Sequence, residues 1–389
     1  MTQIATKFLP FHRASIEEEE IRAVVEVLRS GWLTKGPKVQ EFETAFAAYT
    51  GARHALAVNS CTAALHLGLA AIGLAEGDEV IVPTMTFAAS GEVVLYFKAR
   101  PVLVDCSGST GQMAPDEMAR AITSRTKAIM PMHYAGYPCD MERILEIANR
   151  YNLRVIEDAA HALPTRYKGR LVGTLSDITC FSFYATKTMT TGEGGMATTE
   201  NEDFADRMRL LSLHGISRDA WKRYTAEGSW RYDILEAGYK YNFTDIQAAL
   251  GLAQLAKCDA MHARRSELAA RYTAAIASLE AFEAPPVPID GQHAWHLYAI
   301  QLNTVALRIN RDQVIEELKQ RGIGTSVHFI PLHLHSLYQG RLGYRPGQFP
   351  VAEKYFEREI SLPIYPSMTN EQCDDVIEAL HEITRQFRR

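Results

Sequence analysis

The stretch DMERILEIANRYNLRVIED (residues 140–158) decides the expected fold class. Its first part has the pattern of a helix, and RVIED (154–158) is a short apolar run that ends in a carboxylate. Similar apolar runs lie on both sides of it: VIVP (80–83), PVLVD (101–105), AIMPMH (128–133) and ITCFSF (178–183). Apolar strands joined by helices predict a mostly parallel sheet covered on both faces, so we expect an α/β domain.

Two helices are expected before this sheet. The first, near residues 16–31, opens with Ser15 and Glu18 at the spacing of a capping box, and the second spans about residues 39–51. Together with the strands and their helices, they form an expected large domain over residues 1–250.

The pattern changes after residue 250. An Ala-rich stretch (245–279) predicts one or two long helices, and the prolines of EAPPVPIDG (283–291) end them. The remaining pattern predicts a smaller α+β domain over 251–389, built from the strand HLYAIQL, the helix RDQVIEELKQRG, the strand IGTSVHF and a terminal helix from about Asn370.

The composition limits the class of protein. Of 389 residues, 47% are hydrophobic and 22% are charged, and the net charge is -5, which argues against general attraction to nucleic acid or anionic membranes. The beginning, MTQIATKFLPFHR, lacks a signal-peptide core, and no stretch is long enough to span a bilayer, so we expect a cytoplasmic protein. Six scattered cysteines without a C-x-x-C pair fit reduced thiols.

Polar and aromatic side chains follow the expected strands, at the sheet edge where α/β proteins bind ligands. We expect one pocket to collect them: Thr86, Phe87, His133, Asp158, His161, Ser182 and Lys187. Two interpretations stay open for several members. Asp158 either caps the next helix or pairs with a cation such as a protonated ring nitrogen, Phe87 is a core aromatic or a stacking platform, and His161 meets a ring oxygen or a buried neighbour.

Lys187 lies between an apolar strand and a glycine cluster in FSFYATKTMTTGEGG (181–195). Glycine permits close approach of the backbone to a bound group, so this edge is expected to surround a ligand. Most lysines are solvated surface charges. A desolvated lysine, however, has a lowered pKa and offers a neutral amine for a Schiff base, which makes Lys187 a candidate nucleophile toward an aldehyde.

An anion site is expected in NSCTAALHLGLAAIG (59–73). Ser60 suits an N-cap, and the amides of residues 61–63 are expected to be free at the helix start, where the helix dipole favours an anion. The hydroxyl of Ser182 is a further candidate for the same anion. The alternative is an ordinary capped helix.

Other motifs weigh against competing chemistry. GEGG matches neither the dinucleotide nor the phosphate-loop pattern, which disfavours a nucleotide-sugar dehydrogenase or an ATP enzyme. The histidines of VHFIPLHLHSLY, which include His328, have no fourth ligand at a recognisable spacing, so we expect no metal. Residues 214–242 mix basic and aromatic side chains that suit a nucleotide-linked substrate or a neighbouring subunit.

Seven motifs in order resemble the DegT/DnrJ/EryC1/StrS family of sugar aminotransferases, over nearly the whole chain: GWLTKGPKVQEFE, NSCTAALHLGL, VIVPTMTF, MHYAG, IEDAAHA, FSFYATKTMTTGEGGM and YKYNFTDIQAALG. The resemblance implies the fold type I of transferases that depend on pyridoxal 5'-phosphate (PLP). It further implies a homodimer with active sites at the subunit interface, and amination of nucleotide-linked keto sugars.

The same resemblance implies roles for single residues. Lys187 is the Schiff-base lysine, Asp158 pairs with the pyridinium nitrogen, and Phe87 stacks on the ring. His161 stands where many members carry glutamine and is expected near the ring oxygen. The phosphate is expected to meet Thr62, Ala63 and Ser182, with Asn242 reaching it from the partner subunit.

The substrate is expected from the branch that the motifs resemble. WLTKGPK, HYAG, EDAAHA and GYKYN are similar to the branch that aminates C4 of UDP-4-keto sugars with glutamate, for polysaccharide biosynthesis. Lys35 and Lys240 are expected at the diphosphate and His328 at the substrate. The alternatives are C3 amination of a dTDP- or UDP-3-keto sugar, and a non-catalytic PLP-binding regulator.

Overall fold

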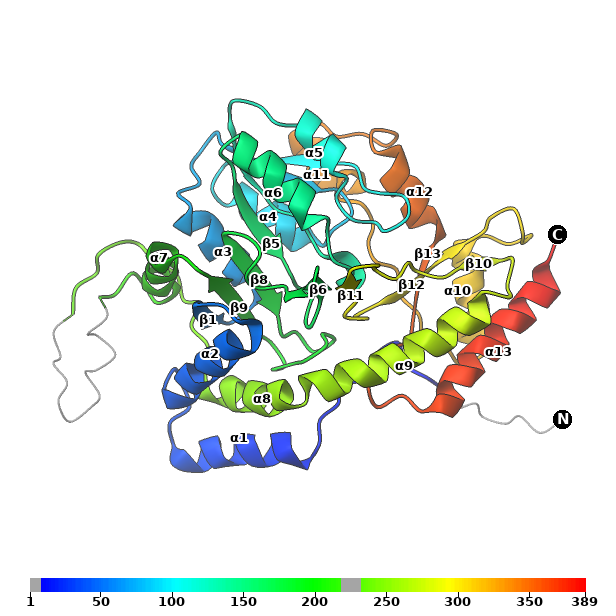
Figure 1. Ribbon diagram of the computed structural model, residues 1–389, viewed down its shortest axis with the longest axis horizontal. Helices are drawn as coiled ribbons and strands as arrows, with labels where there is room; N and C mark the ends of the chain where they lie inside the picture. The colour runs from blue at the N-terminus through cyan, green and yellow to red at the C-terminus, as the bar shows by residue number, and fades with distance from the viewer. Residues whose placement is uncertain (1–7, 218–231) are drawn as a thin grey trace.

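A seven-stranded mixed sheet forms the centre of the computed structural model, which describes residues 8–217 and 232–389 (Figure 1). Its strands lie in the order β1-β9-β8-β5-β4-β2-β3. They are β1 (His54–Val58), β2 (Glu79–Pro83), β3 (Arg100–Val104), β4 (Thr126–Ile129), β5 (Arg154–Asp158), β8 (Ile178–Ser182) and β9 (Gly195–Thr199). The pairings of β9 with β1 and β8 are antiparallel and the other four pairings are parallel, so the predicted mostly parallel α/β sheet is confirmed.

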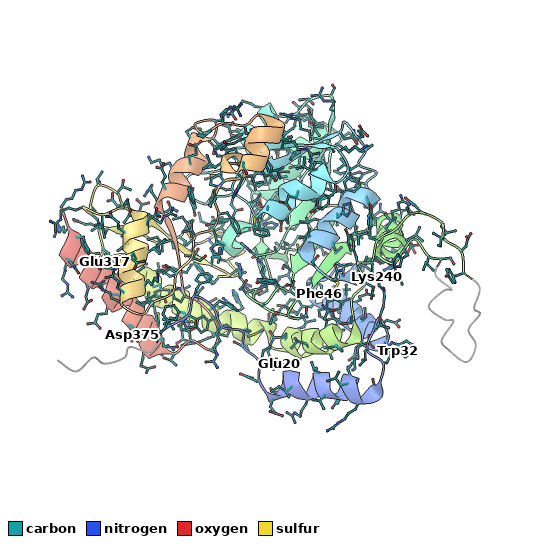
Figure 2. The ribbon with its side chains drawn as sticks, turned by 180° about the vertical axis from the view of Figure 1, so that it is seen from behind. Glu20, Trp32, Phe46, Lys240, Glu317 and Asp375 are labelled. Carbon is teal, nitrogen blue, oxygen red and sulfur yellow. The ribbon has the colours of Figure 1, made fainter. Side chains whose placement is uncertain are left out.

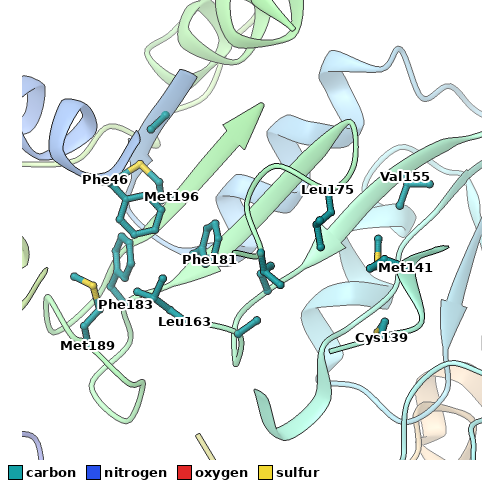
Figure 3. Close-up of a cluster of buried hydrophobic side chains, with 14 of the residues drawn as sticks. Phe46, Cys139, Met141, Val155, Leu163, Leu175, Phe181, Phe183, Met189 and Met196 are labelled. Carbon is teal, nitrogen blue, oxygen red and sulfur yellow. The ribbon is translucent and has the colours of Figure 1, made fainter. Parts of the chain in front are cut away.

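Helices cover both faces of the sheet, because each face carries its own cluster of buried apolar side chains. One face packs against α2 (Pro37–Thr50), α5 (Pro115–Arg120), α6 (Met141–Arg150) and α8 (Asp245–Ala256). The other packs against α3 (Cys61–Ala71), α4 (Ala88–Leu95) and α7 (Glu202–Ser212). Figure 3 shows the first cluster, where Phe46 of α2 meets Phe181 and Phe183 beside the strands.

A second core lies at the other end of the molecule. The long helix α9 (Cys258–Ile276) leads there from α8 (Figure 1). A three-stranded sheet packs on α10 (Arg311–Gln320) and α13 (Asn370–Phe387); its strands are β10 (Phe282–Glu283), β12 (Tyr298–Leu302) and β13 (Glu359–Leu362). Leu9, from the start of the described chain, belongs to this core. The division of the chain at residue 250 stays a prediction.

The remaining short elements join the two cores. A small sheet consists of β6 (Arg166–Tyr167), β7 (Arg170–Leu171) and β11 (Gly291–Gln292). Single 3-10 turns lie at Tyr134–Gly136 and Leu332–Leu334. The C-terminal segment returns to the large sheet through α11 (Ser336–Leu342) and α12 (Pro350–Arg358), where Leu332 and Tyr338 join its core.

The structure corrects several expectations about elements. The helix α1 (Glu18–Ser30) is capped by Glu17, with Glu20 completing the capping box, and Ser15 has a buried hydroxyl without a partner. The predicted strand IGTSVHF forms only isolated bridges, at Ile323 and Ser326, and β13 takes the expected place in the small sheet. The glycine cluster after Lys187 opens the strand β9, which the sequence pattern did not predict.

Two further observations concern the chain as a whole. Within residues 8–217 and 232–389, no helix is long and apolar enough to cross a membrane. All six cysteines are free and buried. Nearly half of the basic and aromatic stretch 214–242 (residues 218–231) lies outside the described residues, so its expected part in nucleotide binding stays a prediction.

Candidate active site

Asp158 ends β5 at the carboxyl edge of the sheet and is almost completely buried. Its side chain accepts hydrogen bonds from Ser90 Oγ at 2.7 Å and from Ala160 N at 3.1 Å. Ser90 lies one turn into α4, and its hydroxyl also meets that of Thr86 at 2.7 Å. Burial raises the pKa of the Asp158 carboxyl, while the bond from Ser90 and the charge of Lys187 act in the opposite direction. The site thus holds a carboxylate ready for a cationic partner.

Lys187 follows β8, in a turn where its amide donates to Tyr184 O at 2.9 Å. Burial lowers the pKa of its amine to about 8, although the acidic groups of Asp158 and Cys61 partly oppose this shift. A substantial fraction of the amine is therefore neutral and nucleophilic near neutral pH. β5 and β8 are neighbouring parallel strands, so Asp158 at the end of β5 and Lys187 after β8 belong to the same sheet edge, and the charge of Lys187 acts on the pKa of Asp158.

The start of α3 lies against β9 beside this site. A Cβ on Gly195 would lie 2.4 Å from Ser60 C and 2.5 Å from Cys61 N, so only glycine lets the helix start approach so closely. Ser60 Oγ accepts a hydrogen bond from Ala63 N at 3.1 Å. The sequence predicted free amides at residues 61–63, and this is wrong for Ala63, whose amide is bonded to Ser60. The amides of residues 61 and 62 are left for an anion.

Phe87 and Ser182 lie at the same sheet edge. Phe87 is the residue before α4; its ring is 58% exposed and touches Phe329 with ring centroids 5.8 Å apart. A large aromatic ring left this exposed has a face available for stacking. Ser182 ends β8, and its hydroxyl accepts a hydrogen bond from Tyr184 N at 3.3 Å.

Three histidine rings line the other side of the site. His161 Nδ1 accepts a hydrogen bond from Ala135 N, and its ring lies 4.2 Å from that of His296 and 6.4 Å from that of His328 between centroids. Burial and the charge of Lys187 lower the pKa of His161 and His296 well below the usual range, and that of His328 to about 3. All three rings are therefore neutral, which leaves His161 with a proton on Nε2.

His133 does not join this site, although the sequence placed it in the same pocket. Its Nε2 pairs with Glu157 at 2.7 Å, and Cys139 N donates to its Nδ1 at 3.0 Å. Glu157 precedes Asp158 on the strand, so its side chain points to the opposite face of the sheet. His333 is likewise occupied, by Thr84 on one ring nitrogen and Glu353 on the other.

The remaining predicted residues lie away from Lys187 within one chain. The backbone of Asn242 forms a β-bridge with Val58. Val58 pairs with Gly195 on β9, and Gly195 pairs with Ser182 on β8. Three strand spacings of about 4.8 Å put the Asn242 backbone about 14 Å from that of Ser182. Figure 2 shows Lys240 and Trp32 at one end of the molecule and Glu317 and Asp375 at the other. Lys35 lies close to Trp32, whose Nε1 donates to Lys35 O at 3.2 Å.

Sequence reasoning missed three residues of this site. Ser90 could have been found, because it is one helical turn after Thr86, at a strand end already singled out. His12 and His296 carried no local signal. His12 Nε2 bonds Ala185 O at 3.0 Å, and His296 packs on His161; both contacts join distant parts of the chain.

Comparison with known proteins identifies the family. The model of the DegT/DnrJ/EryC1/StrS aminotransferase family matches residues 14–381. The chain belongs to this family. An uncharacterised protein of Methanocaldococcus jannaschii is 53% identical over 385 residues, covering 99% of this chain and all of that protein. The spore coat polysaccharide biosynthesis protein SpsC of Bacillus subtilis is 50% identical over 386 residues, covering 99% of each chain.

A solved structure extends the likeness to the cofactor. The PLP form of a putative sugar aminotransferase from Streptococcus pneumoniae superposes with a TM-score of 0.91, at 36% identity over 97% of this chain and 99% of that one. The protein is therefore a PLP-dependent sugar aminotransferase of fold type I, with a sugar substrate and an amino donor.

The residues present fit this cofactor. Lys187 offers an amine of lowered pKa, Asp158 a buried carboxylate, the start of α3 two unpaired amides beside Gly195, and Phe87 an exposed ring. These are the four groups that an aldehyde, a pyridinium, a phosphate and an aromatic face require.

Proposed function

We propose that this protein transfers an amino group from L-glutamate to C4 of a UDP-linked 4-keto sugar. The observation that carries the transamination chemistry is the coupling of the Lys187 amine, whose pKa is about 8, to the buried carboxylate of Asp158. Support for the sugar comes from the motifs WLTKGPK, HYAG, EDAAHA and GYKYN, and from the relative that acts in spore coat polysaccharide biosynthesis. The product is then a building block for a polysaccharide.

Each side chain of the site has a proposed role. PLP, when bound, supplies an aldehyde and a ring that accepts electrons. The amine of Lys187 would hold the aldehyde and, when free, would act as the general base and acid of the site. Asp158, fixed by Ser90, keeps the ring nitrogen protonated. Phe87 would offer a face for the ring, and the neutral His161, whose Nδ1 is held by Ala135 N, would offer its Nε2 proton to the ring oxygen.

The phosphate is proposed to rest on the helix start and on residues from two chains. Thr62 and the hydroxyl of Ser182 are proposed to meet the anion from one protomer, and Ala63 contributes only its small side chain, because Ser60 holds its amide. Asn242 lies about 14 Å from Ser182 within one chain, so it serves the site of a second copy. We therefore propose a homodimer that shares its active sites. Half-exposed apolar side chains on α1, such as Ile21 and Leu28, are available for that contact.

The substrate roles extend these proposals. Lys35 and Lys240 are proposed to meet the diphosphate, since both belong to the end of the molecule that carries Asn242. His328, beside Lys187, is proposed to contact the sugar. We also propose a cytoplasmic location, where glutamate and nucleotide sugars are available, and a division of the chain into residues 1–250 and 251–389.

A substrate panel tests the proposal. The purified holoenzyme is mixed with glutamate, which is expected to bleach the visible absorption of the bound cofactor. The aminated form is then offered UDP- and dTDP-linked 4-keto and 3-keto sugars. Return of the visible absorption with a UDP-4-keto sugar, together with a 4-amino product, supports the proposal. Exclusive turnover of a 3-keto sugar establishes the C3 alternative, and no bleaching with any amino donor establishes a PLP-binding regulator.

A further inference from the structure

The carboxyl of Glu359, which no step so far uses, lies next to His328. Glu359 begins β13 and is completely buried. Its two oxygens have different partners: Oε2 accepts a hydrogen bond from His328 N at 2.8 Å, and Oε1 accepts one from Ser361 Oγ at 2.5 Å. One carboxyl therefore holds the main chain of His328 and a neighbouring hydroxyl at once.

The same hydroxyl reaches the ring of His328. Ser361 Oγ lies 2.8 Å from His328 Nδ1, which closes a chain of contacts from Glu359 through Ser361 to the imidazole. Tyr134 donates its hydroxyl proton to His328 O, so the backbone is held on both sides. His328 Nε2 has no hydrogen bond within the described chain, and the ring is coupled electrostatically to Lys187. The free nitrogen is therefore the one available to a ligand.

The number of protons shared by Glu359, Ser361 and His328 fixes the direction of the hydrogen bonds between them. Ser361 has one hydroxyl proton to donate. If Glu359 is ionised, it accepts the hydrogen bond that the Ser361 hydroxyl donates. Ser361 must then accept a hydrogen bond from Nδ1–H, and Nε2 is a bare acceptor. If Glu359 is neutral with its proton on Oε1, it donates to Ser361, whose own proton then goes to Nδ1, and Nε2 carries the hydrogen.

We propose that Glu359 is a positioning residue that sets, through Ser361, which ring nitrogen of His328 carries the proton. This inference rests on the proposed contact of His328 with the sugar. With Glu359 ionised, Nε2 accepts a hydroxyl or amide proton of the substrate. With Glu359 neutral, Nε2 donates to a carbonyl oxygen. The ionisation of one buried carboxyl thus selects the polarity of the substrate group that His328 recognises.

The surroundings allow both states of Glu359. Burial raises the pKa of its carboxyl to about 8, while Ser361, the amide of His328 and Arg311 oppose that shift. Tyr134 and Tyr355, the latter on α12, face the carboxyl and stay neutral, because burial raises their pKa above the usual range. Gln301 pairs with Glu359 across β12 and β13.

Further groups face the ring rather than the carboxyl. Lys187, His161 and His296 are coupled electrostatically to one another or to His328, and the three histidines are neutral. Among these groups Lys187, with a pKa of about 8, is the second one that changes charge near neutral pH. A test must therefore separate the effect of Glu359 from that of Lys187.

Nitrogen NMR of the holoenzyme labelled with 15N-histidine reads the tautomer directly, without substrate. The signals of His328 are assigned by their loss in His328→Gln. In the natural protein, the Nε2 signal is expected to move from the range of a protonated nitrogen to that of a bare nitrogen as the pH rises through about 8.

Two variants interrupt the hydrogen bonds from Glu359 to His328 at different points. In Glu359→Gln, the amide oxygen must serve His328 N, so the NH2 group faces Ser361 and the Nε2 signal is expected to stay in the protonated range at every pH. Ser361→Ala is expected to uncouple the His328 signal from Glu359. Glu353→Gln is the matched control, because Glu353 contacts His333 in the same way at 2.9 Å, and it is expected to leave His328 unchanged.

The results separate this inference from the proposed function. If His328 titrates in Glu359→Gln as it does in the natural protein, or if Ser361→Ala preserves the transition, the inference is wrong and a group other than Glu359 accounts for the change. If the tautomer follows Glu359 but no UDP-4-keto sugar is aminated, the inference stands and the proposed substrate fails.

Discussion

Lys187 and Asp158 show how burial prepares two side chains for opposite tasks. Burial disfavours the charged form of both groups, so it lowers the pKa of the amine and raises that of the carboxyl. A neutral amine is what the reaction needs from Lys187. Asp158, in contrast, must be charged to hold a ring nitrogen proton, and Ser90 and the amide of Ala160 supply the hydrogen bonds that favour its charged form.

The lowered pKa of Lys187 predicts an unusual pH dependence. The neutral amine prevails above pH 8, so reductive labelling of the cofactor-free protein with a small aldehyde is expected to modify Lys187 with a midpoint near pH 8. Lys187→Arg is expected to lower kcat by about 10²- to 10⁴-fold or more. Lys98→Arg, at an exposed ion pair with Glu76, is the control and should retain activity. A midpoint above pH 10 contradicts the buried environment.

Ser90 is predicted to strengthen cofactor binding through Asp158. Ser90→Ala removes a 2.7 Å hydrogen bond to a buried carboxylate, and such bonds contribute about 1.5–3 kcal/mol. The affinity for PLP, measured by titration of the cofactor-free protein, should fall about 10- to 100-fold. The exposed Ser278→Ala, which loses only a bond to its own helix, should change nothing measurable. Equal affinities for the two variants rule out this role of Ser90.

At the scale of elements, the decisive contact is the start of α3 against the start of β9. The amides of a helix start attract an anion only if they reach the sheet edge beside Lys187. Gly195 makes this possible, because the backbone of residues 60 and 61 occupies the space of a Cβ. The antiparallel β9 also pairs with β8 at Ser182, so the same strand fixes both expected phosphate contacts.

A substitution at Gly195 tests this contact. Gly195→Ala is expected to displace the helix start, to lower PLP affinity at least tenfold and to destabilise the fold by about 1–3 kcal/mol. Thermal unfolding with and without PLP separates the two effects, since the gain in Tm from PLP should shrink. Gly340→Ala, on α11 with nothing within 4 Å of the new Cβ, is the control and should leave Tm unchanged or slightly higher.

At the scale of the whole molecule, two groups of predicted site residues lie in different places. Lys187 lines a small pocket with Met261 and Arg265, whereas Lys240 lies at the end of the molecule opposite the C-terminal helix (Figure 2). Within a single chain, the backbone of Asn242 is three strand spacings, about 14 Å, from that of Ser182. The proposed homodimer with shared active sites accounts for this separation, because Asn242 and Lys240 of one copy would then complete the site of the other.

Mixed dimers test the sharing. Lys187→Ala and Asn242→Ala are each expected to be inactive or nearly so as homodimers. After unfolding and refolding as an equal mixture, half of the dimers are hybrids, and each hybrid has one site with both natural residues. The mixture should recover about a quarter of the natural activity. No recovery, although mass spectrometry shows hybrids, contradicts the sharing of Asn242.

The candidate site was predictable where neighbours in the sequence are neighbours in space. The strand RVIED, its terminal Asp158, the strand before Lys187 and the capped start of α3 follow from local patterns of apolar residues and caps. Prediction failed where a segment's partner decides its form. The short strand β9 (GMATT) has few apolar residues. IGTSVHF forms only isolated bridges, and β13 takes the place in the small sheet that was expected for it.

The sequence by itself thus determined the fold class, the family and the residues at the strand ends, because apolar period, caps and motif order are local properties of the chain. Only the tertiary structure decided three contacts. Ser90 donates a hydrogen bond to Asp158, 68 positions later in the sequence; His133 pairs with Glu157 outside the predicted pocket; and Glu359 accepts a hydrogen bond from His328 N. These contacts depend on which faces of distant elements pack together. That choice is made by the burial of the whole core rather than by any one segment.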